Sequence, residues 1–296
     1  MKLYAPKYYL DFKCIADRCR HSCCIGWEID VDPETMEKYS ALGSGYGQAI
    51  KDSIELSETP HFRLGENERC PHLDERGLCR IISNLSEGLL CDICREHPRF
   101  YNETPRGREV GLGLSCEEAC RIILSSDSFG EIIEVDDVDG EPYDSGFDIL
   151  WHRERIFALL ADESLSYRDK LDEISAEYSV SPCDLSDSEA RSLLSSLEYL
   201  DESHRELFSS YSCETEPAPE LEPILVRALA YFIYRHMTSA ADEYELRAAL
   251  GFSLFCERLL ASCAADIDVL TAARIISEEI EYSEDNTDAI KSEFLF

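Results

Sequence analysis

Cysteine is the residue of this chain whose number and spacing could do chemistry. The sequence has 14 cysteines, and ten of them lie before residue 121. Four fall in the stretch CIADRCRHSCC that begins at Cys14, and the other six are Cys70, Cys79, Cys91, Cys94, Cys116 and Cys120. Thiolates are soft ligands that select zinc or iron–sulfur clusters. The density of thiols therefore predicts a metal site.

The spacing of these cysteines leaves the identity of the metal open. A structural zinc site usually shows two Cys-x2-Cys pairs, or cysteines with histidines. This chain has one such pair, Cys91 and Cys94, and no matching second pair. The neighbours Cys23 and Cys24 point their side chains in different directions, and a cubane cluster accepts more varied ligand spacing than zinc does. Zinc and iron–sulfur are equally compatible with the spacing.

Composition excludes several classes of function. The net charge of −33 argues against nucleic acid as the main partner, because phosphate binding needs basic patches. Composition favours reading this charge as a soluble, self-repelling surface, and the alternative is that it steers a lysine-bearing protein surface towards the chain. No apolar run reaches the roughly 18 residues of a membrane span. The first residues lack the pattern of a signal peptide, so we expect a cytoplasmic protein in a reducing compartment, where clustered cysteines favour metal over disulfides.

The elements that must position the thiols predict an α+β fold that is mostly α. We expect a cysteine-rich, irregular metal-binding domain over residues 1–125, an acidic linker over 126–146 and an α-helical domain over 147–296. In the first domain, Asp32 followed by Pro33 is a helix start signal. The glycines between Gly43 and Gly47 read as a helix exit and surface loop, and the run VGLGLSC reads as a strand that ends at Cys116.

The second half repeats apolar residues at helical spacing from residue 149 onwards. Four further cysteines lie in this half without partners in the pattern, and we expect them to be ordinary small side chains: Cys183, Cys213, Cys256 and Cys263. Tyr231 is expected to be a packing residue.

Four motifs in order carry a resemblance to a known family. They are FKCIADRCRHSCCIGWEIDVD, RCPHLDERGLCRI, CREHPRF and LSCEEACR, and the resemblance runs from about residue 4 to residue 122. They resemble the flagellin lysine N-methyltransferase family, within a broader group that has a cysteine-rich zinc- or iron-chelating domain. The resemblance extends more loosely through the helical second half.

The resemblance implies methyl transfer from S-adenosylmethionine to lysines of flagellin or another lysine-bearing protein. It also implies an iron–sulfur cluster of the 4Fe-4S type, with zinc as the alternative. It assigns metal binding to eight thiols: Cys14, Cys19, Cys23, Cys24, Cys70, Cys79, Cys94 and Cys116. Cys91 and Cys120 appear as additions to the family pattern and carry less weight.

The residues leave other roles open. No glycine-rich cofactor loop or radical-enzyme cysteine motif is present, so the S-adenosylmethionine site and the catalytic residues stay unassigned and a polar SN2 transfer is the default mechanism. Trp27, Asp30 and Arg99 are noted only because they lie near cysteines in the sequence. The alternatives to an enzyme are a non-enzymatic zinc- or iron-binding module, or a redox protein that works through Cys23–Cys24 or Cys91–Cys94.

Overall fold

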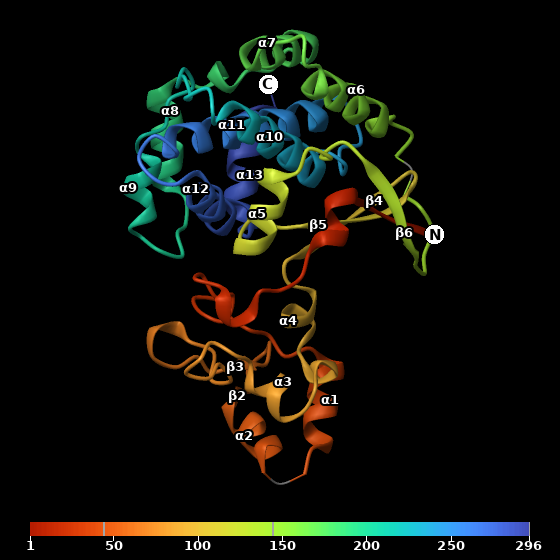
Figure 1. Ribbon diagram of the computed structural model, residues 1–296, viewed down its shortest axis with the longest axis vertical. Helices are drawn as coiled ribbons and strands as arrows, with labels where there is room; N and C mark the ends of the chain where they lie inside the picture. The colour runs from red at the N-terminus through yellow and green to blue at the C-terminus, as the bar shows by residue number, and fades with distance from the viewer. Residues whose placement is uncertain (44, 144, 296) are drawn as a thin grey trace. The chain divides into compact units, whose positions relative to one another are not determined.

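A computed structural model describes residues 1–43, 45–143 and 145–295 (Figure 1). The chain divides into two compact units, which are described separately. The cysteine-rich unit comprises Lys13–Pro98 and Cys116–Glu118. The helical unit comprises Met1–Phe12, Arg99–Ser115 and Ala119–Phe296.

The cysteine-rich unit is built from short elements. Its helices and strands are η2 (Ala16–Arg18), α1 (Pro33–Ala41), α2 (Tyr46–Ser53), β2 (Ile54–Glu55), β3 (His61–Phe62), η3 (Glu66–Glu68), α3 (Arg80–Asn84), η4 (Glu87–Leu89) and α4 (Asp92–Glu96). β2 and β3 form a two-stranded antiparallel sheet. Helices this short are marginal on their own, so tertiary packing must hold them.

The start of α1 confirms the expected cap. The Asp32 side chain accepts a hydrogen bond from the Thr35 backbone N–H at 2.8 Å, and Pro33 occupies the first turn. The second Asp32 oxygen accepts from the Asp92 backbone N–H at 2.9 Å, where α4 begins. One carboxylate therefore joins the starts of two helices. The glycine loop after α1 includes Ser44, which lies outside the described residues.

The helical unit contains one mixed sheet of four strands in the order β4-β5-β1-β6. The strands are β1 (Lys2–Pro6), β4 (Arg99–Thr104), β5 (Gly107–Leu112) and β6 (Ile132–Asp137). β4 pairs with β5 antiparallel, β5 with β1 parallel, and β1 with β6 antiparallel. The register of β1 against β6 shifts between Leu3 and Tyr4. The expected strand before Cys116 is thus β5.

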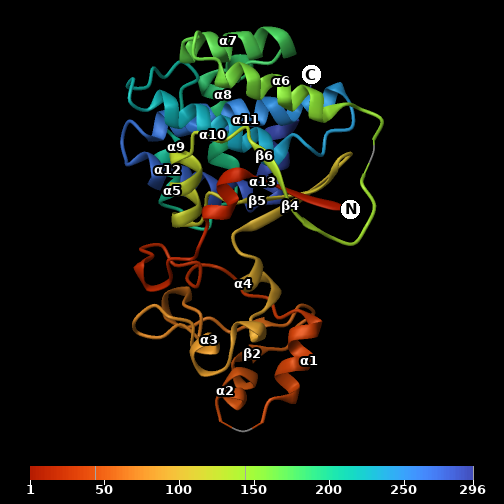
Figure 2. The same cartoon turned by 45° about the vertical axis from the view of Figure 1, so that its right-hand side comes forward.

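Helices make up the rest of this unit. They are η1 (Lys7–Asp11), α5 (Glu117–Ser125, which begins in the cysteine-rich unit), α6 (Ile149–Ala161), α7 (Tyr167–Tyr178), η5 (Pro182–Asp184), α8 (Asp187–Ser196), α9 (His204–Phe208), α10 (Glu222–His236), α11 (Glu243–Cys263), α12 (Val269–Ile276), the π-helix η6 (Ser277–Glu281) and α13 (Glu284–Ser292). α10 and α11 pack together in the middle of the unit, with α6 and α7 over α10 (Figures 1 and 2).

The observed class is α+β and mostly α, as predicted, with 52% helix and 11% strand. The division between units differs from the expected domain boundary at 126–146. That segment contains β6, which pairs with β1 at the start of the chain. Two of the four cysteines expected to lack partners, Cys183 and Cys213, are instead joined by a disulfide, and their Cα separation of 5.4 Å is within the usual range for one.

None of the described helices is long and apolar enough to cross a lipid bilayer.

Candidate metal centre

Five thiols lie together in the core of the cysteine-rich unit. We call them the inner thiols: Cys24, Cys70, Cys79, Cys91 and Cys94. Cys70 and Cys91 belong to the buried hydrophobic cluster of this unit, and the other three pack against it. Electrostatic interactions link the set further, since Cys94 interacts with Cys91, Cys24 and Cys70, and Cys79 interacts with Cys24 and Cys91. The core of this unit therefore combines sulfur atoms with aliphatic and aromatic side chains.

Backbone hydrogen bonds hold the inner thiols in place. The Cys70 N–H donates to the Cys24 carbonyl at 2.8 Å, which joins two segments that are distant in sequence. Cys79 directly precedes α3, and the Cys94 N–H donates to the Cys91 carbonyl at 3.0 Å in the first turn of α4. Beside them, the Tyr39 hydroxyl donates to the Leu89 carbonyl at 2.7 Å and lies 3.6 Å from the Cys91 Sγ.

A second set of thiols lies nearer the surface of the same unit. We call them the outer thiols: Cys14, Cys19, Cys23 and Cys116. Cys23 interacts electrostatically with Cys14 and Cys116, and Cys19 interacts with Cys116. Glu117 anchors this set because it accepts hydrogen bonds from the backbone N–H groups of Arg20 at 2.8 Å and His21 at 3.2 Å. The two sets meet where Cys23 and Cys24 are hydrogen-bonded to each other.

Burial and mutual contact shift the acidities of these thiols. Burial raises the pKa of Cys70 to about 12 and that of Cys19 to about 11. A hydrogen bond with Cys23 lowers the pKa of Cys24 to about 7. A hydrogen bond with Cys94 lowers the pKa of Cys91 and raises that of Cys94. Each hydrogen-bonded pair thus favours one thiolate and one thiol, and a second negative charge is unfavourable without a cation.

The chemical type of these side chains is suited to a thiophilic metal. Five sulfur atoms gather in one core and four more beside it, and a bound cation would offset the repulsion that keeps neighbouring thiols protonated. Within the described residues, no three Cys, His, Asp or Glu side chains lie around one point as the ligands of a single ion would. Two pairs of thiols, Cys23 with Cys24 and Cys91 with Cys94, instead affect each other's pKa through a hydrogen bond.

Comparison with known proteins places this chain in a family. The flagellar biosynthetic protein FliU of Salmonella muenchen is 31% identical over 127 residues, which make up 40% of this chain and 75% of that protein. The chain belongs to the FliU and lysine-N-methylase family. This confirms the family that the four cysteine motifs predicted.

Two further relatives carry the name lysine-N-methylase. They come from Salmonella choleraesuis strain SC-B67 and Salmonella typhimurium strain LT2, and each is 32% identical over 127 residues. The match covers 40% of this chain and 32% of each relative, so the chain spans about a third of the length of these lysine-N-methylases. No protein-family model and no solved structure matches the chain.

The structure divides the eight thiols expected from the family pattern between the two sets, four in each. Cys91, an addition to the family pattern, lies with the inner thiols and is fully buried. Cys120, the other cysteine given less weight, belongs to the helical unit, where its Sγ lies 3.5 Å from the Leu270 carbonyl. The burial of Cys91 is a consequence of its place before α4, which the sequence pattern did not reveal.

The three residues noted because they lie near cysteines in the sequence do not share one environment. Arg99 lies in the helical unit, where its Nε donates to the Tyr9 hydroxyl at 2.9 Å. Asp30 lies in the cysteine-rich unit, and its buried Oδ1 has no hydrogen-bond partner among the described residues. Trp27 is half-buried in the same unit. Sequence proximity to a cysteine therefore did not place all three at one site.

A buried polar network in the helical unit was missed by the sequence analysis. The Glu281 carboxylate, on the π-helix η6, accepts a hydrogen bond from Tyr231 at 2.9 Å and lies 2.7 Å from His236 Nε2. Burial acts to raise the pKa of Glu281, but the charge of Arg235 and the hydrogen bond with His236 hold it at about 2. Burial lowers the pKa of His236 to about 4. A charged carboxylate thus faces a neutral imidazole inside the helical core.

Proposed function

We propose that this protein is a lysine N-methyltransferase that transfers a methyl group from S-adenosylmethionine to lysines of flagellin and carries an iron–sulfur cluster of the 4Fe-4S type. The observation that carries the proposal is the 31% identity to FliU over 75% of that protein's length. The lysine-N-methylases of Salmonella supply the reaction class. The gathered thiols support the cluster, and the excess of acidic residues supports a lysine-bearing partner.

The proposed reaction is a single displacement. The lysine ammonium first loses a proton, and its nitrogen lone pair then attacks the methyl carbon of the sulfonium. One N–C bond forms as one C–S bond breaks, and the products are methyl-lysine, S-adenosylhomocysteine and a proton. An enzyme accelerates this step by holding the nitrogen in line with the C–S bond and by accepting the proton.

The cluster has a structural role in this proposal. The inner thiols Cys24, Cys70, Cys79, Cys91 and Cys94 would hold it, because they occupy the core of their unit and come from segments far apart in the sequence. A metal centre there would close the loop between Cys24 and Cys70 and stabilise α3 and α4. Zinc in place of the cluster would serve the same structural end.

The test uses the full chain after anaerobic reconstitution with iron and sulfide. Iron and sulfide analysis and an absorbance spectrum establish the cluster, and labelled S-adenosylmethionine then reports transfer to flagellin, with mass spectrometry locating the modified lysines. We expect label on lysines and none on a flagellin whose surface lysines are changed to arginine. No transfer by protein whose cluster is intact would contradict the enzyme and favour a metal-binding module.

A pair of cysteine variants separates metal binding from loss of any thiol. Cys94→Ser removes an inner thiol, whereas Cys120→Ser removes a buried thiol of the helical unit. We expect Cys94→Ser to lose iron and Cys120→Ser to keep it. Equal iron content in the two variants would contradict the assignment of the inner thiols.

A further inference from the structure

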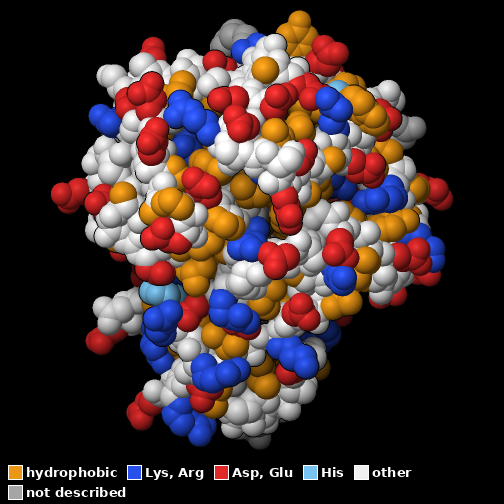
Figure 3. Space-filling model, turned by 45° about the horizontal axis from the view of Figure 1, so that its top comes forward, with side chains coloured by type: hydrophobic (Ala, Val, Ile, Leu, Met, Phe, Trp, Pro, Cys, Tyr) orange, Lys and Arg blue, Asp and Glu red, His pale blue; other side chains and the backbone are white. Residues whose placement is uncertain are grey.

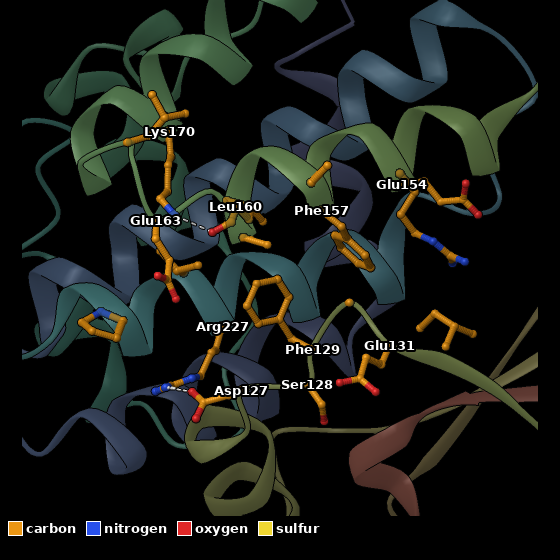
Figure 4. Close-up of a pocket in the computed structure, with 18 of the residues that line it drawn as sticks. Asp127, Ser128, Phe129, Glu131, Glu154, Phe157, Leu160, Glu163, Lys170 and Arg227 are labelled. Carbon is orange, nitrogen blue, oxygen red and sulfur yellow. Dashed lines mark hydrogen bonds and ion pairs between the residues drawn. The ribbon is translucent and has the colours of Figure 1, made fainter.

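A pocket of about 980 Å³ opens within the helical unit, away from every free thiol described above (Figure 4). It is lined by the segment 127–132, by α6, by the start of α7 and by the start of α10. The volume is at the upper end of the range for small-molecule sites. Nothing in the proposed function assigns a role to it.

The middle of the pocket is aromatic and apolar. Phe129 and Phe157 meet edge to face with ring centroids 6.2 Å apart, and both rings lie centrally in Figure 4. Phe157 is 6% exposed, whereas Phe129 is only half-buried and is therefore accessible to a ligand. Leu160 and Val226 continue the apolar lining. An aromatic face of this kind attracts cations as well as apolar groups.

The positive charges of the lining already have partners. Arg106 and Arg153 both bind Glu109, at 2.7 Å and 2.6 Å. The guanidinium of Arg227 binds Asp127, and the ammonium of Lys170 donates to the Leu160 carbonyl (Figure 4). Each of the four groups thus has a partner in the protein, although the Nε atoms of Arg106 and Arg153 are buried without a partner among the described residues.

The negative charges of the lining are in excess. Glu131 pairs with Lys7 at 2.7 Å. Among the described residues, no ion pair forms with the three other glutamates of the pocket: Glu154, Glu163 and Glu222. Glu163 lies on the side of Lys170 and Arg227 in Figure 4. The pocket thus combines an accessible aromatic surface with carboxylates that are in no ion pair, although Glu163 interacts electrostatically with Lys170 and Glu154 with Arg153.

From this combination we propose that the pocket binds an organic cation, a sulfonium or alkylammonium group carried on an apolar body. A metal ion would need several carboxylates around one point, and within the described residues no such arrangement exists. A neutral apolar ligand would leave the carboxylates without a counter-charge. Two ligands of the proposed reaction carry the required chemistry, the methyl donor and the lysine side chain, and in this form the inference rests on the proposed function.

Binding experiments with matched probes test the proposal on the full chain. S-adenosylmethionine is compared with S-adenosylhomocysteine, which lacks the methyl group and the positive charge on sulfur. Nα-acetyl-lysine methylamide is compared with its Nε-acetylated counterpart, which lacks the ammonium. We expect calorimetry to show one charged member of these pairs binding roughly tenfold tighter than its neutral partner.

Variants assign the binding to this pocket. Phe129→Ala removes the accessible ring, and Glu163→Gln removes a charge at an exposed position. Asp172→Asn is the matched control, because Asp172 is an exposed acid of α7 that does not line the pocket. We expect Glu163→Gln to reduce the preference for the charged probe roughly threefold, Phe129→Ala to weaken both members of the pair, and Asp172→Asn to change neither.

The outcomes are distinguishable from those of the methylation assay. Tighter binding of S-adenosylmethionine identifies the methyl donor as the occupant, and tighter binding of the lysine compound identifies the acceptor. Equal binding of charged and neutral probes, or affinities unchanged in both Phe129→Ala and Glu163→Gln, would overturn the proposal even where the wild type methylates flagellin. Cation binding by a chain that transfers no methyl group would support the pocket and contradict the proposed function. Circular dichroism confirms that each variant is folded, and the exposed Glu163→Gln carries the test should Phe129→Ala unfold.

Discussion

The cysteine-rich unit and the helical unit stabilise their interiors in different ways. The helical unit has the 21-residue helix α11, in which 17 residues are buried, packed against α10. The cysteine-rich unit has no helix longer than the nine residues of α1 among its described residues, and its core contains Cys70 and Cys91. Small cores usually need disulfides or a metal to be stable. The helical unit is therefore held by packing, whereas under the proposed function the cysteine-rich unit depends on a metal held by its thiols.

Charge also separates the two units. The cysteine-rich unit has 10 Lys and Arg against 18 Asp and Glu, whereas the helical unit has 18 against 43. On the face shown in Figure 3, Lys and Arg side chains gather on the part that bears the cysteine-rich unit. Most of the net charge of −33 therefore belongs to the helical unit, which also holds the acidic pocket. Attraction of a cationic partner is thus assigned mainly to that unit.

The largest expected effect is that of metal removal. Chelation of the reconstituted protein should abolish amide hydrogen-exchange protection in residues 13–98 while leaving that of α10 and α11 close to its original value. Structural metal sites contribute on the order of 10 kcal/mol to the folding of small domains, and no such term applies to the helical unit. Mass spectrometry of exchanged peptides measures both units in one sample.

Inner-thiol variants sharpen this prediction. Cys91→Ser should lose protection in residues 13–98 as fully as Cys94→Ser, because both sulfur atoms lie in the same core. Loss of protection in both units together, or in neither, would contradict a division between packing and metal binding.

The contrast between the units also determines how much the sequence could predict. The helices of the second half follow from apolar residues at a period of 3.6, and the cap at Asp32 follows from its neighbour Pro33. Both signals are local. The pairing of β6 with β1 joins residues more than 120 positions apart, and the acidic composition of 126–146 concealed the strand.

The site was predictable in type but not in arrangement. The sequence predicted that the cysteines before residue 121 gather and that Cys23 and Cys24 point in different directions, but it could not show which set of thiols each one joins. That choice depends on the backbone between them and on the Cys70 N–H that binds the Cys24 carbonyl. The Cys183–Cys213 disulfide was not predicted for the same reason, because no local sequence signal connects residues 30 positions apart. Polar groups such as Glu281 and His236 are recognisable only once their burial is known.

A second prediction tests the claim that the helical unit is held by close packing. Gly251 of α11 lies against the ring of Phe294, so an added Cβ would overlap that ring. Alanine normally favours a helix over glycine by about 1 kcal/mol, yet we expect Gly251→Ala to lower the free energy of unfolding by about 2 kcal/mol. Gly43→Ala is the control because nothing lies within 4 Å of its added Cβ. Urea denaturation that shows no loss for Gly251→Ala would mean that this interface is loosely packed.

A third prediction concerns the buried imidazole of the helical unit. His236 titrates near 6.5 when unfolded and has a pKa of about 4 when folded, because burial disfavours its charged form. The unfolded chain therefore binds the proton more readily, and stability falls as the pH drops from about 7 towards 4. Between pH 7.5 and pH 5, protonation of the unfolded chain at His236 should lower the free energy of unfolding by about 2 kcal/mol. Urea denaturation should show that the free energy of unfolding of His236→Gln depends on pH less than that of the wild type, by this amount. An unchanged pH dependence would mean that another group binds the proton on unfolding.

The smallest effects are expected from substitutions that remove one helix cap in each unit. Asp32 accepts from the backbone N–H groups of Thr35 and Asp92, and so it joins the start of α1 to the start of α4 beside Cys91. Ser166 caps α7 alone, in a reciprocal arrangement with Asp169. Loss of one helix cap lowers the free energy of unfolding by about 1 kcal/mol. Ser166→Ala should therefore lower it by that amount, and Asp32→Ala by somewhat more.

The residues that lose hydrogen-exchange protection in each variant show whether a cap stabilises its own helix alone or also the thiol-bearing helix α4. Because the Asp32 carboxylate positions the helix that bears Cys94, Asp32→Ala should increase hydrogen exchange in residues 80–98 as well as in α1. Ser166→Ala should act only within the helical unit, near α7. Asp32→Asn keeps one carbonyl acceptor, and we expect it to protect α1 while exposing the start of α4. Equal exchange in residues 80–98 for all three variants would show that the thiol-bearing helix is held without Asp32, by the thiols and their ligand alone.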